Sequence, residues 1–319
     1  MSDLLARFAE SAFWLARYME RADNLARIID VNETFARDSE TAVDWLPIVE
    51  INADSESFFA KHDEAVAEAV IDFYVRDLDN PTSIISSVRS ARENARMVRH
   101  LISTEMWLHL NVFYGELREL SGESLGLSDL PDLCALVKEH CQTHVGITEG
   151  TLYRDQVWSF HELGRHLERA DQTTRMLDIK YRRLLPSPEL VGSPLDVGQW
   201  NAVLRSAAGY HAFRRVHPSG MRPETVAGFL LFDRDFPRSV TLSLQRASEL
   251  LDGLSLRYGL AGGRPAEILQ SLRARLQSDR IGVVIAEGLH EYLDDIQFRI
   301  IEITEEMGLR FFGHEQTAA

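Results

Sequence analysis

Residues 15–30 read LARYMERADNLARIID, and residues 163–178 read LGRHLERADQTTRMLD. The two stretches align without a gap at a constant offset of 148 residues, the difference between positions 165 and 17. Apolar side chains in the first stretch recur mostly every three or four residues, which is the spacing of an amphipathic helix. An ungapped match of this kind indicates the duplication of one long helix that carries arginine and glutamate.

Helical spacing continues along most of the chain, and the sequence shows no sustained alternation with a period of two residues. Ser2 and Asp3 are available to cap the first helix, and Asp235 to cap a helix that runs to Tyr258. Pro223 stands where a first-turn proline is tolerated. Further helices are expected at 58–78, 84–120, 132–146, 151–185, 199–216, 265–276 and 281–312, with breaks at 44–57, 121–131, 186–194 and 217–220.

The sequence therefore predicts an all-α fold, a multi-helix bundle with an internal pseudo-repeat of the long Arg/Glu-bearing helix. We expect one helical domain over residues 1–319. Its related halves would be approximately 1–150 and 151–319, as the offset between the two stretches requires.

Composition limits the classes of partner and compartment. The 319 residues include 49 acidic and 34 basic side chains, which give a formal net charge of -15. A negative excess of this size repels phosphate backbones, so nucleic acid is not expected as a partner. The longest apolar run, Val226 to Phe232, is far shorter than the roughly 20 residues of a membrane span. Cys134 and Cys141 form no CxxC motif, and without an apolar signal segment at the N-terminus the sequence favours the cytoplasm.

Polar side chains of the duplicated helix gather on one stripe in each copy, because successive residues are about 100° apart. The two stripes hold Arg17, Glu20, Asn24 and Arg27, and Arg165, Glu168, Gln172 and Arg175. One interpretation is a solvated face, on which the pairs Asp23–Arg27 and Asp171–Arg175 each contribute about 0.2–0.5 kcal/mol. The other is an enclosed lattice, favoured by Phe13, which lies one turn before Arg17.

An enclosed lattice requires the two copies to bring their guanidinium and carboxylate groups together near a pseudo-twofold axis. Arginine forks could then hold a carboxylate or phosphate bidentately, or a desolvated carboxylate could acquire a raised pKa suited to proton transfer. Glu20 and Glu168 are the candidate acids or bases. The candidate ligand-binding residues are Arg17, Glu20, Arg21, Asn24, Arg27, Arg165, Glu168, Arg169 and Arg175.

Four groups of motifs along the chain resemble those of the bacterial alpha-E family of helical proteins. They are FWLARYMERADN at 13–24, ARENAR at 91–96 with ISTEMW at 102–107, the second copy at 163–178, and YHAFRR at 210–215 with FLLFDRDFPRSV at 229–240. The resemblance implies no established reaction. It implies ATP-grasp ligase-like and transglutaminase-like proteins as neighbours or fusion partners, and hence a peptide-synthesis or peptide-modification system.

Metal chemistry finds little support in the sequence. Carboxylate-bridged dimetal sites in helical bundles need two Glu-x-x-His pairs, and only Glu287 to His290 has that spacing. Two further pairs stand at i, i+4, namely Glu105–His109 and His140–His144. We therefore expect no metal site and no cofactor.

Three hypotheses for function remain open at this point. The first is an accessory protein that docks with an ATP-grasp-like ligase or binds its anionic peptide or amino-acid ligand. The second is an enzyme in which Glu20 or Glu168 acts as general acid or base while arginines orient a substrate carboxylate. The third is a purely structural scaffold.

Overall fold

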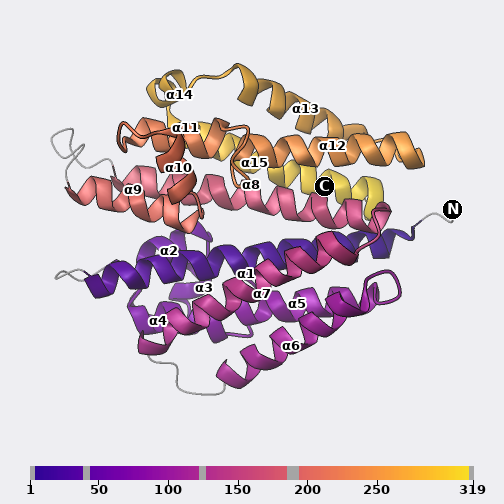
Figure 1. Ribbon diagram of the computed structural model, residues 1–319, viewed down its shortest axis with the longest axis horizontal. Coiled ribbons are helices and arrows are strands. Elements are labelled where there is room, and N and C mark those ends of the chain that lie inside the picture. Colours follow the sequence, from indigo (N-terminus) through magenta and orange to yellow (C-terminus); the bar gives the residue numbers. More distant parts are fainter. Residues whose placement is uncertain (1–3, 39–43, 122–126, 185–193, 316–319) are drawn as a thin grey trace. The chain divides into compact units, whose positions relative to one another are not determined.

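The computed structural model describes residues 4–38, 44–121, 127–184 and 194–315, and every regular element in these ranges is a helix (Figure 1). This confirms the predicted all-α fold, whereas the internal pseudo-repeat stays a prediction, and 'duplicated helix' and 'copy' refer below to the two matching stretches of sequence. The elements in chain order are α1 (Ala6–Asp38), α2 (Leu46–Ile51), α3 (Ser55–Phe59), α4 (Ala67–Ile71), the π-helix η1 (Asp72–Arg76), α5 (Ile84–Met97), α6 (Thr104–Ser121), the 3₁₀-helix η2 (Leu127–Asp129), α7 (Leu130–Thr151), α8 (Gln156–Leu184), α9 (Pro194–Ser206), α10 (Tyr210–Val216), α11 (Pro223–Phe232), α12 (Val240–Tyr258), α13 (Gly263–Ser278), α14 (Ile281–Glu287), α15 (Leu289–Met307) and the π-helix η4 (Gly308–Phe312). Within the described ranges, none of the helices combines the length and hydropathy that a bilayer crossing needs.

The chain divides into two compact units, one formed by Met1–Arg17 with Tyr153–Ala319 and the other by Tyr18–Leu152. The long helix α1 passes from the first unit into the second after Arg17. The first copy of the duplicated helix is therefore shared between the units, whereas the second copy lies in α8 of the first unit.

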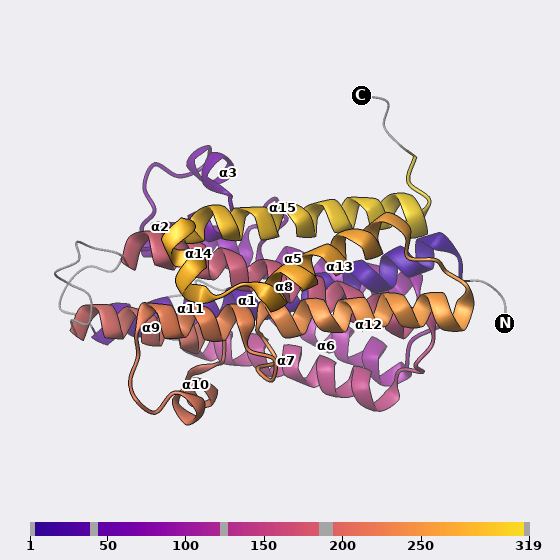
Figure 2. The same ribbon diagram turned by 90° about the horizontal axis from the view of Figure 1, so that it is seen from above.

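The first unit is built around α8. Helix α8 packs against α12 and α15, and α13 contacts both of these, so the four helices close a ring of neighbours. Figure 2 shows α13 lying between α12 and α15. Fully buried aliphatic side chains fill the core between these helices, among them Leu163, Leu167, Leu244, Leu293 and Ile296.

The second unit, described by itself, contains the successive helices α5, α6 and α7, with α5 against α6 and α6 against α7. Ser83 caps α5, because its hydroxyl accepts a hydrogen bond from the backbone N–H of Ser86 at 3.2 Å. The predicted helix start at Ile84 is thereby confirmed. The predicted start of α11 at Pro223 is also confirmed, with the proline in the first turn.

Several predicted helices are wrong because local backbone geometry divides them. The expected helix at 281–312 is broken at Gly288, whose φ of 125° lies outside the helical region. The expected helix at 199–216 is broken where Ala208 adopts a φ of 53°. The expected helix at 84–120 ends at Met97, and Ser103 starts a new one by accepting the N–H of Met106 at 3.1 Å.

Other boundaries differ for similar reasons. The segment expected as a break at 44–57 contains α2 and α3, because Pro47 occupies a first-turn position that tolerates it. The expected helix at 58–78 is interrupted before α4, where Val66 is extended. The cap of α12 is Ser239 and not Asp235, since the Ser239 hydroxyl accepts the N–H of Leu242 at 3.1 Å. The proposed caps Ser2 and Asp3 lie outside the described residues.

Candidate functional site

Several residues of the polar stripe are buried and not solvated. Arg17 is 8% exposed and Glu168 is fully buried, although both carry a charge. Asp171 and Gln172 are buried as well. The solvated-face interpretation is therefore wrong for these residues of the first unit, and a buried charge requires a partner.

Arg17 and Glu168, one from each copy, form an ion pair. Nε of Arg17 donates to Oε2 of Glu168 at 2.7 Å. The other carboxylate oxygen accepts from Nε2 of Gln172 at 3.3 Å, one turn further along α8. Nη1 of Arg17 donates to the hydroxyl of Thr304 on α15 at 3.1 Å. Three segments of the first unit thus meet at one polar cluster, and the pairing is short enough to be charge-assisted.

Aromatic rings cover the guanidinium of Arg17. Its central carbon lies 4.8 Å from the ring centroid of Trp14 and 5.7 Å from that of Phe13. Rings at this distance attract a cation through their quadrupole and exclude water from it. The position of Phe13 one turn before Arg17 predicted this cover.

The close approach of α8 to α1 depends on Gly164. A Cβ atom at this position would lie 3.0 Å from the carbonyl carbon of Phe13, and closer still to the carbonyl oxygen. No other residue type leaves room for that carbonyl. The first copy has Ala16 at the matched position, so the two copies differ at the point where they approach.

A second buried carboxylate, Glu162, lies one and a half turns before Glu168 on α8. Its oxygens contact Nδ1 of His161 at 3.1 Å, Nη2 of Arg165, and Nε2 of His166 at 3.9 Å. Burial alone would raise the pKa of Glu162, but the hydrogen bond from His161 and the positive charge of Arg165 lower it to about 2. Glu162 is therefore ionised at neutral pH and is held as an acceptor.

The remaining predicted residues of the first unit make the following contacts. Nη2 of Arg165 contacts the carboxylate of Glu162. Arg169 is buried and its Nη1 donates to the carbonyl of Pro237 at 3.4 Å. Arg175 pairs with Asp171 at 2.8 Å, as the i, i+4 spacing predicts.

The other candidates lie on α1 within the second unit. Glu20 and Asn24 are buried, and the guanidinium of Arg21 lies 5.6 Å from the ring of Tyr18. Arg27 pairs with Asp23 at 2.9 Å, which repeats the pair made by the matched residues of α8. The convergence of Glu20 with the Arg17 cluster stays a prediction.

Sequence reasoning missed Thr304 and the role of Glu162. Thr304 is 287 positions from Arg17, and no local pattern connects them. Glu162 gave a usable signal, since an acid three residues before Arg165 faces it on a helix.

A family model described as a predicted alpha-helical domain with a conserved ER motif, Alpha-E, matches residues 4–312. The chain belongs to the Alpha-E family. The resemblance inferred from the motifs is thereby confirmed. Glu-Arg occurs as a dipeptide twice in this Alpha-E chain, at Glu20–Arg21 and Glu168–Arg169, once in each copy of the duplicated helix.

Similar proteins occur in mycobacteria. An uncharacterized protein of Mycobacterium bovis is 23% identical over 313 residues, which cover 91% of this chain and 34% of the relative. An uncharacterized protein of Mycobacterium tuberculosis is 22% identical over the same shares of the two chains. The Alpha-E chain thus spans about a third of the length of the curated relatives that it matches. No solved structure matches it.

Proposed function

We propose that this Alpha-E chain is a cytoplasmic accessory component that binds an anionic amino-acid or peptide ligand in an ATP-grasp-linked system of peptide synthesis or modification. The observation that carries the proposal is the state of Arg17. Its guanidinium is fixed by hydrogen bonds to Glu168 and Thr304, and its side chain is 9% exposed to solvent.

The hydrogen bonds of Arg17 leave one side of its guanidinium group available to a ligand. Nε and Nη1 each donate to a side chain, and no described residue accepts a hydrogen bond from Nη2. A guanidinium held by other groups loses little conformational freedom when it binds a carboxylate, so pre-organisation favours affinity. The aromatic cover reduces competition from water at the same group. A carboxylate of a peptide or amino acid is the ligand class that suits this donor.

The link to an ATP-grasp-like or transglutaminase-like partner rests on the family resemblance and on the length of the relatives. Because this domain occupies only 34% of the mycobacterial relatives, it functions there as part of a longer chain. We infer that the Alpha-E chain likewise acts with a catalytic partner and does not supply the whole reaction. Affinity capture from the native host, with mass spectrometry of the bound proteins, tests for a ligase-like or transglutaminase-like partner.

The test of ligand binding uses triglutamate, with triglutamine as the uncharged comparison, in isothermal titration calorimetry of the full chain. We expect saturable binding of triglutamate only, and an at least tenfold weaker affinity in Arg17→Gln. Arg246→Gln is the matched control, because Arg246 lies on the same unit but is exposed and pairs only at the surface of α12. The affinity of Arg246→Gln for triglutamate should stay within twofold of that of the original chain.

The alternatives predict different results. A structural scaffold predicts that the original chain binds neither peptide. An enzyme predicts that the peptide is consumed and that Glu168→Gln, folded by circular dichroism, abolishes the turnover. Equal binding of triglutamate by Arg17→Gln and the original chain would refute the proposed site.

A further inference from the structure

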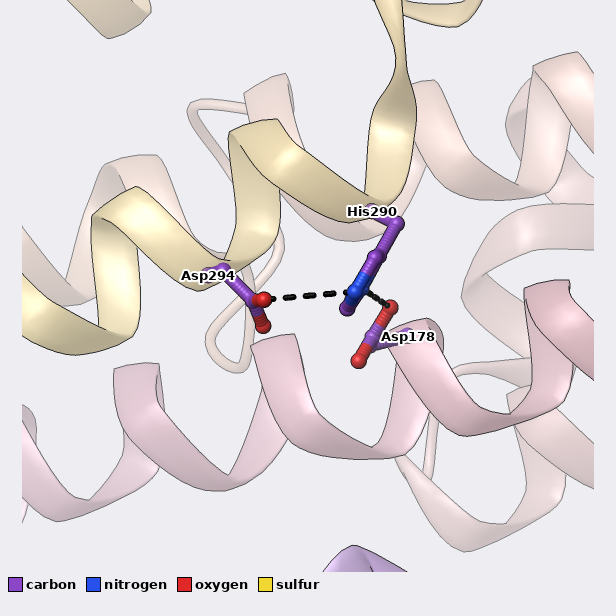
Figure 3. A group of neighbouring side chains, drawn as sticks. All are labelled: Asp178, His290 and Asp294. Carbon is purple, nitrogen blue, oxygen red and sulfur yellow. Dashed lines mark hydrogen bonds and ion pairs between the residues drawn. The ribbon is translucent and has the colours of Figure 1, made fainter.

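A second cluster of charged side chains lies in the first unit, away from Arg17. Asp178 of α8 faces His290 and Asp294, which stand one turn apart on α15 (Figure 3). Nδ1 of His290 lies 2.7 Å from Oδ1 of Asp178, and Nε2 lies 3.3 Å from Oδ2 of Asp294. One ligand atom from each of the three residues falls within 4.8 Å of the other two.

The imidazole of His290 is thus held between two carboxylates. A neutral imidazole donates from one nitrogen only, so its other lone pair would face a carboxylate oxygen. Two species remove this repulsion. One is a proton, which makes the ring a cation, and the other is a metal ion that accepts the imidazole lone pair and both carboxylates.

The geometry suits a single ion. Residues at i and i+4 on a helix face the same side, so His290 and Asp294 can hold one ion between successive turns. Asp178 supplies a ligand from the neighbouring helix, and α8 and α15 are packed against each other. Three protein ligands leave further coordination positions open, as in catalytic and exchangeable metal sites.

Access and charge favour the same conclusion. The exposed fraction of the side chain rises from 9% for Asp178 through 29% for His290 to 55% for Asp294, so the cluster opens to solvent on one side. The neighbouring Glu291 adds negative charge, whereas Asp295 pairs with Arg275 and Arg299. An acidic surround of this kind attracts cations, while the inner carboxylate remains sheltered from competing water.

The matching position of the first copy carries the same residue with a different partner. Asp30 stands at the position that matches Asp178, and its Oδ2 lies 2.8 Å from Nζ of Lys138. In the second copy Asp178 faces His290, and imidazole is a side chain that binds metals.

We propose that Asp178, His290 and Asp294 bind one divalent cation of the zinc class. The nitrogen ligand favours first-row transition ions over Mg²⁺ and Ca²⁺, which take oxygen ligands. Zn²⁺ accepts imidazole and carboxylate together at about 2.0–2.2 Å. Because Asp178 and Asp294 contact different nitrogens of His290, one of the two carboxylates would turn towards the nitrogen that binds the ion. The sequence-based expectation of no metal site missed this cluster, because Asp178 and His290 are 112 positions apart.

The test is a titration of the metal-free full chain with ZnCl₂, followed by calorimetry, with MgCl₂ in a parallel experiment. We expect one Zn²⁺ per chain and no comparable binding of Mg²⁺. His290→Gln and Asp294→Asn should each weaken Zn²⁺ binding at least tenfold. Asp294 is exposed, so its variant keeps the test valid if His290→Gln fails to fold.

Matched controls separate this site from general attraction to an acidic surface. His211→Gln and Asp252→Asn change exposed residues of the same types in the same unit and should leave the affinity within twofold. Visible absorption of the Co²⁺-loaded chain, lost in His290→Gln, would show that nitrogen is a ligand. Equal binding of Zn²⁺ and Mg²⁺, unchanged affinity in His290→Gln, or no binding at all would overturn the proposal.

Discussion

Substitution of Gly164 by alanine should destabilise the first unit, although it makes the two copies of the duplicated helix more alike. The added Cβ would meet the carbonyl group of Phe13 on α1 and would lie 3.3 Å from Cγ of Arg17. The arginine side chain can adjust, but a helical carbonyl cannot turn away. Helices α1 and α8 must therefore separate by roughly 1 Å to restore an ordinary contact distance.

The magnitude follows from two opposing effects. Overpacking of a rigid contact costs about 1–3 kcal/mol, and the separation also lengthens the 2.7 Å ion pair between Arg17 and Glu168. Alanine is a better helix former than glycine by about 1 kcal/mol, which offsets part of this cost. We expect a net loss of about 2 kcal/mol in the free energy of unfolding.

Urea denaturation followed by circular dichroism measures this change. Gly253→Ala is the matched control, since Gly253 lies inside α12 of the same unit and an added Cβ there would meet nothing within 4 Å. That variant should gain about 0.5–1 kcal/mol from helix propensity alone. If Gly164→Ala is as stable as Gly253→Ala, the close approach of α8 to α1 is refuted.

Three further perturbations test the same unit. Arg17→Gln removes the ion pair that Arg17 makes with the buried carboxylate of Glu168, so it should lower the free energy of unfolding by about 3–5 kcal/mol in urea denaturation, with partial recovery in the double variant that also carries Glu168→Gln. The pKa of Glu162 in the folded chain is about 2, below its ordinary value of 4.5. The ionised carboxylate therefore stabilises the fold by about 3 kcal/mol above pH 4.5, and this contribution is lost as the pH falls towards 2. Denaturation at a series of pH values should show a flatter profile for Glu162→Gln over that interval. Ser239→Ala should lower the free energy of unfolding by about 1–2 kcal/mol because it removes the cap of α12. Asp235→Ala should change the same quantity by less than about 0.5 kcal/mol.

The sequence predicted the fold class because helix periodicity is a local property. The long helices α1 and α8 and the starts of α5 and α11 could be located from spacing, prolines and caps. Breaks between helices were harder to predict, because each depends on the backbone angle of a single residue. Ala208, with a φ of 53°, carries no signal in its side chain that would mark the end of a helix.

The candidate site was predicted in part. The stripe containing Arg17 and Glu168 is visible in the helical wheel, and the match between the two stretches singled it out. The sequence left two interpretations of the stripe open, because Phe13 favoured burial, whereas an amphipathic helix ordinarily exposes its polar side. Partners such as Thr304 and the pair Asp178–His290 depend on tertiary packing between helices distant in sequence.

The contacts between α1 and α8 fix the register of the two helices. The carbonyl of Phe13 fits against Gly164, and one turn further on Arg17 pairs with Glu168, so both contacts advance by four residues in the same direction. A slip of one residue would drive a side chain into the carbonyl and separate the charges at once. An apolar pair of similar volume would stabilise the fold at least as well but would tolerate such a slip, because apolar contact lacks direction. The buried charges therefore contribute specificity more than stability, and the fixed guanidinium that results is the feature on which the proposed binding of a ligand at Arg17 rests.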